Sequence, residues 1–383
     1  MKDAVKLADC VSPAMTEAEY WIKRCPLSNN IRMTQSKIKT FNRNNINRLA
    51  GKNVLYDLAG FSEFTENKAL SCVHAYGICV RRSMLWSDIN GVEPLTAIYV
   101  GEPVIILEEE KEWYKVRCVY YEGWINSEAI ALCDRKDWIQ SAGYKRIYGC
   151  ACTDSTFSGY ACSDNQNTAG NMCNRPDFVV ITGDYITLPH ISELSGLRLD
   201  MGVILQLAAP DEYCGMYYNY IVKVPSRNAD GYLEYITTGI PISEDVNPGY
   251  LDYTGANVLR QAFKTLGNVY GWAGSMYSRD CSSLVMDVHR CFGIIMPRDV
   301  AGQMLISAVH SCNSEDILKV LRPGDILGFP GHTMIYAGYE KNHYVISATG
   351  GKYNSCILST LCIRRENGMT WLEAVTYGKL PVC

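Results

Sequence analysis

A segment with two prolines, residues 241–248, separates two parts of the chain that carry different hydrophobic patterns. Before it, from about residue 78, short runs of β-branched and aromatic residues alternate with Gly, Pro and charged residues at intervals of about ten residues. After it, apolar residues first recur at helical spacing and then form strand-like runs. We therefore expect several domains, with residues 241–248 as the linker into the last one.

Length and charge narrow the classes of protein that fit. The chain has 383 residues, 48% of them apolar, which suffices for roughly two to four small domains. The net charge of -4 comes from 36 basic and 40 acidic residues without blocks of one sign, which favours neither nucleic acid nor a membrane surface as partner. The longest apolar runs, 104–107 and 204–209, are far shorter than the roughly 20 residues of a membrane-spanning helix.

The compartment stays open at this point. Residues 1–10 lack the apolar stretch of a secretory signal peptide. The protein is therefore expected in the cell envelope or outside the cell if a signal peptide has been removed, and in the cytoplasm otherwise.

The chain has 17 cysteines, and because this number is odd at least one thiol must stay free. The tightest group lies in a segment rich in Ser, Asn, Gly and Thr and consists of Cys150, Cys152, Cys162 and Cys173. Disulfides or free thiols are favoured there over zinc, because the paired C-x-x-C spacing of structural zinc sites is absent. No metal ion or cofactor is expected.

The first part of the chain predicts a helical arm. Residues 1–75 are polar with helical character, residues 16–22 fit a capped helical turn, and the Asn-rich residues 41–48 are expected to interrupt the helical pattern.

Two small β-barrels are expected next. For the first, residues 76–140, the predicted strands are 98–107, 113–119 and 123–130, and this order resembles bacterial SH3-like barrels. A second barrel of the same kind with a loop insertion is predicted for residues 141–245, on the weaker evidence of three strand-like runs at 201–207, 216–224 and 231–237.

The last part, residues 246–383, carries the candidate chemistry. Residues 257–267 predict an amphipathic helix, and after a loop a second helix opens at Asp280-Cys281-Ser282-Ser283. Cys281 thus falls in the first turn of a helix. The positive end of the helix dipole stabilises a thiolate there, and the free N–H groups of that turn can receive an oxyanion.

A cysteine nucleophile also needs a base that takes its proton and passes it to the leaving amine. His332 is the best candidate, because it begins a predicted strand beside a turn and strand at residues 322–329. A histidine at that place can face a helix start across a cleft. His289 falls on a different side of its helix from Cys281.

These motifs together resemble the NlpC family of papain-like cell-wall cysteine peptidases, over about residues 250–349. They are Tyr270-Gly271-Trp272-Ala273-Gly274, Asp280-Cys281-Ser282-Ser283, Arg322-Pro323-Gly324-Asp325 and the run from Gly331-His332 to Tyr336 and Gly338. The upstream domains are similar to a subgroup with an N-terminal helical clip and two SH3-like barrels. The resemblance implies an α+β fold in which helices pack on the antiparallel sheet of a papain-like domain.

The subgroup consists of γ-D-glutamyl-L-diamino acid endopeptidases, so the resemblance implies a murein peptide as substrate and hydrolysis of that amide bond. Carried over by motif position, Cys281 is the nucleophile and His332 the base. Tyr270, Asp280 and Ser282 are implied to line the pocket for the free amine of an N-terminal L-alanine. The first barrel is expected to close one end of the cleft and so to select short peptides.

The third catalytic position departs from the family, which usually has a polar residue there, most often histidine. Ser347 takes this place in the natural alignment, and His343 lies on the same strand face four residues earlier. His343 could orient His332 only if the strand were shifted, so Ser347 is preferred.

Simpler interpretations remain beside the catalytic one. Asp280 can serve only as a helix N-cap, Ser282 can bind helix N–H groups, and Tyr270 can be a core aromatic residue. Two other functions also fit: a non-catalytic protein that binds cell-wall peptides, and another amide hydrolase or acyltransferase on the same fold. The sequence leaves the oligomeric state and the preferred diamino acid open.

Overall fold

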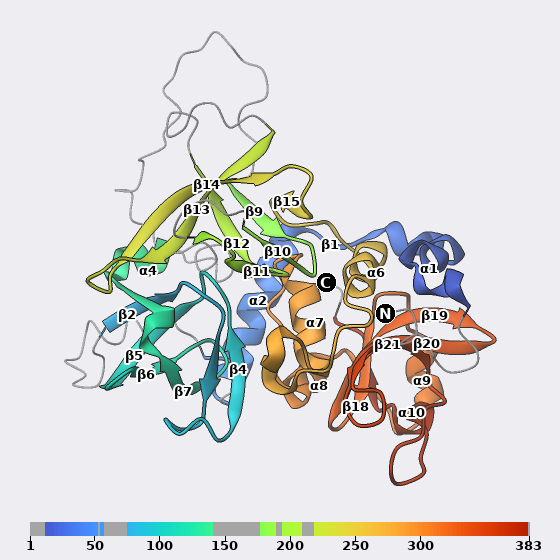
Figure 1. The fold of residues 1–383 in the computed structure, drawn as a ribbon. Helices are drawn as coiled ribbons and strands as arrows, with labels where there is room; N and C mark the ends of the chain where they lie inside the picture. Colours follow the sequence, from blue (N-terminus) through green and yellow to red (C-terminus); the bar gives the residue numbers. More distant parts are fainter. Residues whose placement is uncertain are drawn as a thin grey trace.

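The computed structural model describes residues 12–52, 54–56, 75–140, 177–188, 194–208 and 218–381. The group of four cysteines from Cys150 to Cys173 lies outside these residues. The described chain forms an N-terminal arm (12–56), a first β unit (75–133), a second β unit (177–248) and a C-terminal domain (249–381). Figure 1 shows both β units on one side of helix α7 (Cys281–Arg290) and the C-terminal sheet on the other.

The N-terminal arm is mainly helical and packs on the C-terminal domain. Trp21 is 1% exposed and lies against the ring of Tyr344, with 5.0 Å between centroids. The arm contains a strand that pairs with β16 (Tyr253–Thr254). Its elements are η2 (Pro13–Thr16), α1 (Ala18–Arg24), η3 (Pro26–Asn29), β1 (Ile31–Met33) and α2 (Gln35–Ala50).

The expected interruption at residues 41–48 was wrong, because α2 runs through it. Asn42 is buried inside this helix. Its side-chain amide donates to the carbonyl of Gly293 (2.8 Å), and its oxygen accepts from the N–H of Ile295 (2.9 Å). Asparagine is a poor helix former on its own, but these two bonds to the C-terminal domain favour it here.

The first β unit is a seven-stranded antiparallel sheet in the order β4-β3-β7-β6-β5-β2-β8. Three of its strands correspond to the predicted runs. Within the described residues, no pairing joins the end strands β4 and β8 into a closed barrel. The strands are β2 (Ala75–Cys79), β3 (Ser83–Trp86), β4 (Pro94–Ile98), β5 (Pro103–Glu110), β6 (Trp113–Arg117), β7 (Glu122–Asn126) and β8 (Ile130–Cys133), and α4 (Arg135–Gln140) follows.

The second β unit has a five-stranded sheet in the order β14-β13-β12-β9-β15 and a separate pair, β10 with β11. Its described part likewise shows no closed barrel. Residues 246–248 of the expected linker form strand β15, which pairs with β9 and is an edge strand of the sheet. The strands are β9 (Phe178–Ile181), β10 (Tyr185–Thr187), β11 (Arg198–Asp200), β12 (Ile204–Leu207), β13 (Asn219–Arg227), β14 (Leu233–Pro241) and β15 (Val246–Pro248).

In the C-terminal domain, helices pack on a six-stranded sheet in the order β17-β22-β18-β19-β20-β21, whose recorded pairings are all antiparallel. The strands are β17 (Val309–His310), β18 (Ile326–Phe329), β19 (His332–Glu340), β20 (Asn342–Thr349), β21 (Ser355–Thr360) and β22 (Tyr377–Gly378). The helices are α6 (Gly255–Phe263), η7 (Trp272–Tyr277), α7, α8 (Val300–Ile306), α9 (Ser314–Leu318) and α10 (Trp371–Ala374).

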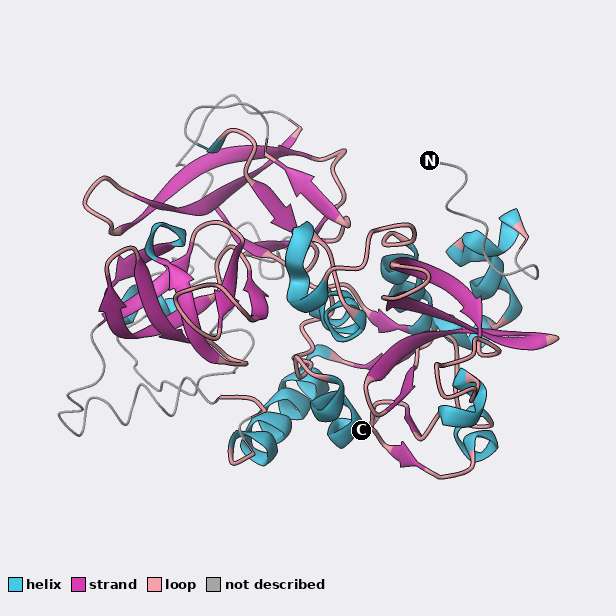
Figure 2. Cartoon of the chain, turned by 60° about the horizontal axis from the view of Figure 1, so that its bottom comes forward, coloured by secondary structure: helices cyan, strands magenta, loops and turns pink. Residues whose placement is uncertain are grey.

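Helix α7 lies at the centre of the packing. Its residues Leu284, Val285 and Val288 are fully buried and belong to one apolar core with Ile335 of β19 and Ile346 of β20. The same core includes residues of the arm and of the first β unit. Figure 2 shows a group of helices between the strand-rich parts of the molecule, and further helices around the sheet on the right of the view. Among the described residues, none of the helices has the length and apolarity to cross a membrane.

Candidate active site

Cys281 begins helix α7, as the sequence predicts. Asp280 is the N-cap and accepts a hydrogen bond from the N–H of Ser283 (2.8 Å). The Cys281 side chain is 7% exposed, and the backbone N–H of Thr333 on β19 points to its sulfur. The thiol therefore lies at a helix start and beside the residue that follows His332.

His332 is the first residue of β19, and Ser347 lies on the neighbouring strand β20. The hydroxyl of Ser347 is 2.7 Å from Nε2 of His332. The imidazole also packs on Trp371, with 4.8 Å between ring centroids, and on Phe329 at 5.5 Å. Because Ser347 occupies Nε2, Nδ1 is the ring nitrogen left to accept a proton from a thiol.

The structure brings Ser347, rather than His343, to His332. His343 pairs with Tyr339 near the turn of the β19–β20 hairpin, and its Nδ1 is 2.8 Å from the hydroxyl of Tyr336. The strand is not shifted in the way that a bond from His343 to His332 would require.

Burial opposes charge on both Cys281 and His332. Burial, with the nearby Asp280 carboxylate, raises the pKa of the Cys281 thiol to about 12, although the N–H groups of Thr333 and Ser282 and the charge of Arg298 act in the other direction. Burial and the charge of Arg365 lower the pKa of His332 to about 4. Both shifts keep the free protein's thiol and imidazole neutral near pH 7, so a resting thiolate, which the helix start alone would favour, is not expected.

Alkylation of Cys281 by iodoacetamide should therefore rise by about tenfold per pH unit from about pH 6 to 9, because only the thiolate reacts. Mass spectrometry of the Cys281 peptide measures this rate separately from that of the exposed Cys312. A rate that is already constant above about pH 5 would instead show a resting thiolate–imidazolium pair.

Asp280 is engaged by the protein itself. Arg298 donates from two nitrogens to its two oxygens (2.7 and 3.1 Å), and the N–H of Ala273 donates to Oδ2 (3.0 Å). Burial would raise the pKa of this carboxyl, but Arg298 and Ser283 hold it below its usual value. Its oxygens are thus occupied, and we infer a structural role in place of the implied contact with a substrate amine.

Ser282 belongs to the same buried network. Its hydroxyl receives a hydrogen bond from Arg298 (3.0 Å) and donates to Asp280 (3.3 Å). Its carbonyl accepts from the side chain of Gln303 (2.9 Å). Ser282 therefore ties the first turn of α7 to the segment around α8.

Tyr270 lies beside the thiol and is half-buried. Burial raises its pKa, and the proximity of Cys281 and Asp280 raises it further. Its ring packs on the backbone of Gly350, where an added Cβ would come within 3.3 Å of the ring. Tyr270 is thus placed beside Cys281 and Asp280.

A carboxylate next to this network escaped the sequence prediction. Asp299 is exposed at the N-cap of α8, and the hydroxyl of Tyr121 from the first β unit donates to it at 2.5 Å. Asp299 directly follows Arg298, the partner of Asp280 and Ser282. The one local signal was an acidic residue before a helix, and nothing in the sequence pairs it with a tyrosine 178 positions earlier.

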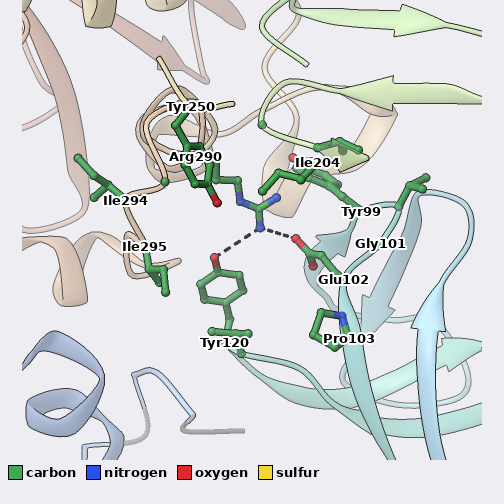
Figure 3. Close-up of a pocket in the computed structure, with 15 residues that line it drawn as sticks. Tyr99, Gly101, Glu102, Pro103, Tyr120, Ile204, Tyr250, Arg290, Ile294 and Ile295 are labelled. Atoms are coloured by element: carbon green, nitrogen blue, oxygen red, sulfur yellow. Dashed lines mark hydrogen bonds and ion pairs between the residues drawn. The ribbon is translucent and has the colours of Figure 1, made fainter. Parts of the chain in front are cut away.

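A separate pocket lies at the junction of the three larger parts of the molecule (Figure 3). Its lining includes neither Cys281 nor His332. In it, Arg290 at the C-terminal end of α7 forms an ion pair with Glu102 of the first β unit and donates a longer hydrogen bond to the hydroxyl of Tyr120 (3.4 Å). This ion pair anchors the end of α7 that lies opposite Cys281.

Comparison with known proteins agrees with this architecture. The chain is 25% identical to dipeptidyl-peptidase 6 of Lysinibacillus sphaericus over 271 residues, which cover 68% of this chain and 82% of the relative. It resembles an NlpC/P60 endopeptidase from Photobacterium damselae subsp. piscicida (TM-score 0.59, 16% identity, 80% of this chain and 73% of the other).

A second solved structure, an NlpC/P60 family protein from Bacillus cereus ATCC 10987, has a TM-score of 0.52 at 14% identity and covers 81% of this chain and 100% of the other. These two likenesses concern the fold. The sequence profile of the NlpC/P60 family matches residues 267–372, the segment that holds Cys281, His332 and Ser347. The C-terminal part of this chain is therefore an NlpC/P60 family domain with a papain-like fold, in a molecule of mixed helices and sheets.

Proposed function

We propose that this protein is a cysteine peptidase that hydrolyses the γ-D-glutamyl-L-diamino acid bond of murein peptides, with a preference for short peptides that begin with a free L-alanine. The observation that carries the proposal is the placement of Cys281 at the start of α7, beside the strand that begins with His332, which Ser347 holds through Nε2. The family match and the name of the dipeptidyl-peptidase relative support a peptidase.

The proposed reaction begins from the neutral pair. Nδ1 of His332 takes the thiol proton as the sulfur of Cys281 attacks the carbonyl of the γ-glutamyl bond. The N–H groups of the first turn of α7 stabilise the oxyanion, and His332 then protonates the departing diamino acid. Water hydrolyses the thioester and restores the thiol. The step requires no metal ion.

Ser347 acts in this account as the residue that orients the base. Its hydroxyl donates to the carbonyl of Ala348 (3.4 Å) and so can accept from the N–H of Nε2, which leaves Nδ1 free for the thiol proton. Trp371 and Phe329 restrict the rotation of the ring. A hydroxyl is neutral and, unlike a carboxylate, does not stabilise the positive charge of the protonated His332 ring. Ser347 therefore orients the base without this charge stabilisation.

Asp299 is the proposed anchor of the substrate's free amine. An ammonium needs a carboxylate whose oxygens it can reach, and Asp299 is exposed with Tyr121 as its recorded partner, whereas the oxygens of Asp280 are occupied by Arg298 and the helix start. Tyr270 forms a wall of the same subsite in this proposal, and Tyr121 closes its far side. A peptide still attached to glycan has no free amine for Asp299.

The upstream parts fit the same proposal. In this proposal, residues 1–75 are assigned to the helical clip, residues 76–140 and 141–245 to two SH3-like units, and residues 246–383 to the peptidase domain. The first β unit supplies Tyr121, which limits the length of peptide on the amine side.

The proposal is tested with three peptides: L-Ala-γ-D-Glu-meso-diaminopimelate, its N-acetyl derivative, and the isomer with the α-linked bond. Mass spectrometry follows release of free diaminopimelate. Rapid cleavage of the first peptide alone supports the bond and the free amine. Equal cleavage of the N-acetyl peptide would contradict the amine requirement, and cleavage of the α-linked isomer would contradict the bond.

Replacement of Asp299 by asparagine should lower kcat/KM for the free-amine peptide by about 10–100-fold, chiefly through KM, because a charge-assisted hydrogen bond is lost. Any residual activity on the N-acetyl peptide should stay the same. Asp316→Asn is the matched control, since Asp316 is an exposed carboxylate on α9. An unchanged KM in Asp299→Asn would remove Asp299 from the amine subsite.

A further inference from the structure

The backbone just before the nucleophile adopts conformations that are costly for L-residues. Ala273, Met276 and Tyr277 have φ angles of 57°, 55° and 53°, and Gly274 has 88°. A non-glycine residue in this region is strained, because its Cβ lies too close to the following carbonyl oxygen. Such a segment keeps its shape only when its surroundings hold it.

One side chain of the first β unit holds this segment at both ends. Arg82, directly before β3, is buried, and its Nη2 donates to the carbonyls of Gly274 (2.7 Å) and Ser278 (2.9 Å). Its Nη1 donates to Asp200 of the second β unit (2.6 Å). A single guanidinium thus joins both β units to the strained segment, in the fork geometry that only arginine offers.

The segment is coupled to the start of α7. The N–H of Ala273 donates to Asp280, the N-cap that precedes Cys281 (3.0 Å), and Ser278 stands two residues before that cap. Gly274 lies so close to Ala97 of β4 that an added Cβ would approach its Cβ to 2.9 Å. A shift of the segment away from the first β unit would therefore move the N-cap and the first turn of the helix.

We propose that Arg82 is a positioning residue for the nucleophile: through the segment 272–279, the first β unit sets the geometry of the helix start that carries Cys281. The inference rests on the proposed function for its effect on catalysis. In this proposal, the geometry of the helix start at Cys281 depends on a residue nearly 200 positions upstream.

The positioning of Cys281 by Arg82 must be distinguished from a general role of Arg82 in holding the two β units and the C-terminal domain together. Arg290 offers the comparison, because its ion pair with Glu102 also joins α7 to the first β unit, but at the opposite end of the helix (Figure 3). Arg81, the exposed neighbour of Arg82, pairs with Glu128 on the surface and controls for loss of charge alone.

The experiment compares full-length Arg82→Met, Arg290→Met and Arg81→Met for peptide hydrolysis and for hydrogen exchange measured by mass spectrometry. Arg82→Met should lower kcat by about 100-fold with KM within about threefold, because a displacement near 1 Å at the nucleophile has that effect. Exchange should rise selectively in residues 272–284. Arg290→Met should show neither change to a comparable extent, and Arg81→Met should match the wild type.

Arg82→Lys covers the case in which Arg82→Met does not fold. Lysine can keep one bond to Asp200 but cannot span both carbonyls, so this variant should fold and still have a kcat about tenfold below the wild type. A kcat in Arg82→Lys equal to that of the wild type, or exchange in 272–284 that rises equally in Arg290→Met, would overturn the proposal. If the wild type cleaves no peptide, the proposed function fails, and the exchange comparison still decides the role of Arg82.

Discussion

Replacement of His332 by alanine is expected to lower kcat for the γ-linked peptide by roughly 10³–10⁴-fold. The thiol of Cys281 has its pKa raised to about 12, so without a base almost no thiolate forms near neutral pH. The imidazole, whose pKa is lowered to about 4, is neutral and can accept the proton when the sulfur attacks. Steady-state hydrolysis and circular dichroism of the variant measure the loss and confirm the fold.

Two further variants show whether the loss of kcat is specific to removal of the base. Ser347→Ala should lower kcat by only about 10–100-fold, because it removes an orienting bond and leaves the proton acceptor in place. His343→Ala should retain wild-type kcat, since His343 bonds Tyr336 near the hairpin turn. Strong loss in His343→Ala and none in Ser347→Ala would reverse the assignment of the third residue.

Replacement of Asp280 by alanine should cost about 3–5 kcal/mol of unfolding free energy. Arg298 and Asp280 are buried together, with side chains 4% and 7% exposed, so the variant leaves a buried guanidinium without its charge partner. The helix also loses its N-cap. Urea unfolding at pH 7 measures the cost. The wild type and Asp280→Ala are compared in the same buffer, because the effect depends on charge.

Acid should also weaken the bond between Asp280 and Arg298 in the wild type. The folded protein holds the pKa of Asp280 below its usual value, so the stabilisation is complete above about pH 4 and is lost as pH falls through the lower folded pKa. Asp299→Asn is the contrasting variant and should unfold within about 0.5 kcal/mol of the wild type, as is usual for an exposed residue. If Asp280→Ala kept its stability and only raised KM, Asp280 would be a substrate ligand after all.

Local patterns were enough to predict the elements that carry the site. The Asp280-Cys281-Ser282-Ser283 motif marks a helix start, and the structure has α7 begin at Cys281 with Asp280 as its cap. The strand that begins at His332 was likewise predicted, whereas Ser347 was assigned to His332 through the resemblance to the NlpC family and not from local patterns. These features depend on periodicity and capping, which neighbouring residues determine.

The parts that escaped prediction depend on contacts between distant residues. Asn42 looks unfavourable for a helix until its two bonds to residues 293 and 295 are known. The ion pair of Asp280 with Arg298 was not predicted either. The pairing of Tyr121 with Asp299 and the bonds of Arg82 join the first β unit to the active site, and a single sequence contains no signal for such pairs.

The most direct test of the central claim is release of diaminopimelate from L-Ala-γ-D-Glu-meso-diaminopimelate by the wild type and by Cys281→Ala, with Cys312→Ala as the control for loss of an exposed thiol. We expect release by the wild type and by Cys312→Ala, and none by Cys281→Ala. Equal release by Cys281→Ala, or binding of the peptide without release by the wild type, would contradict it.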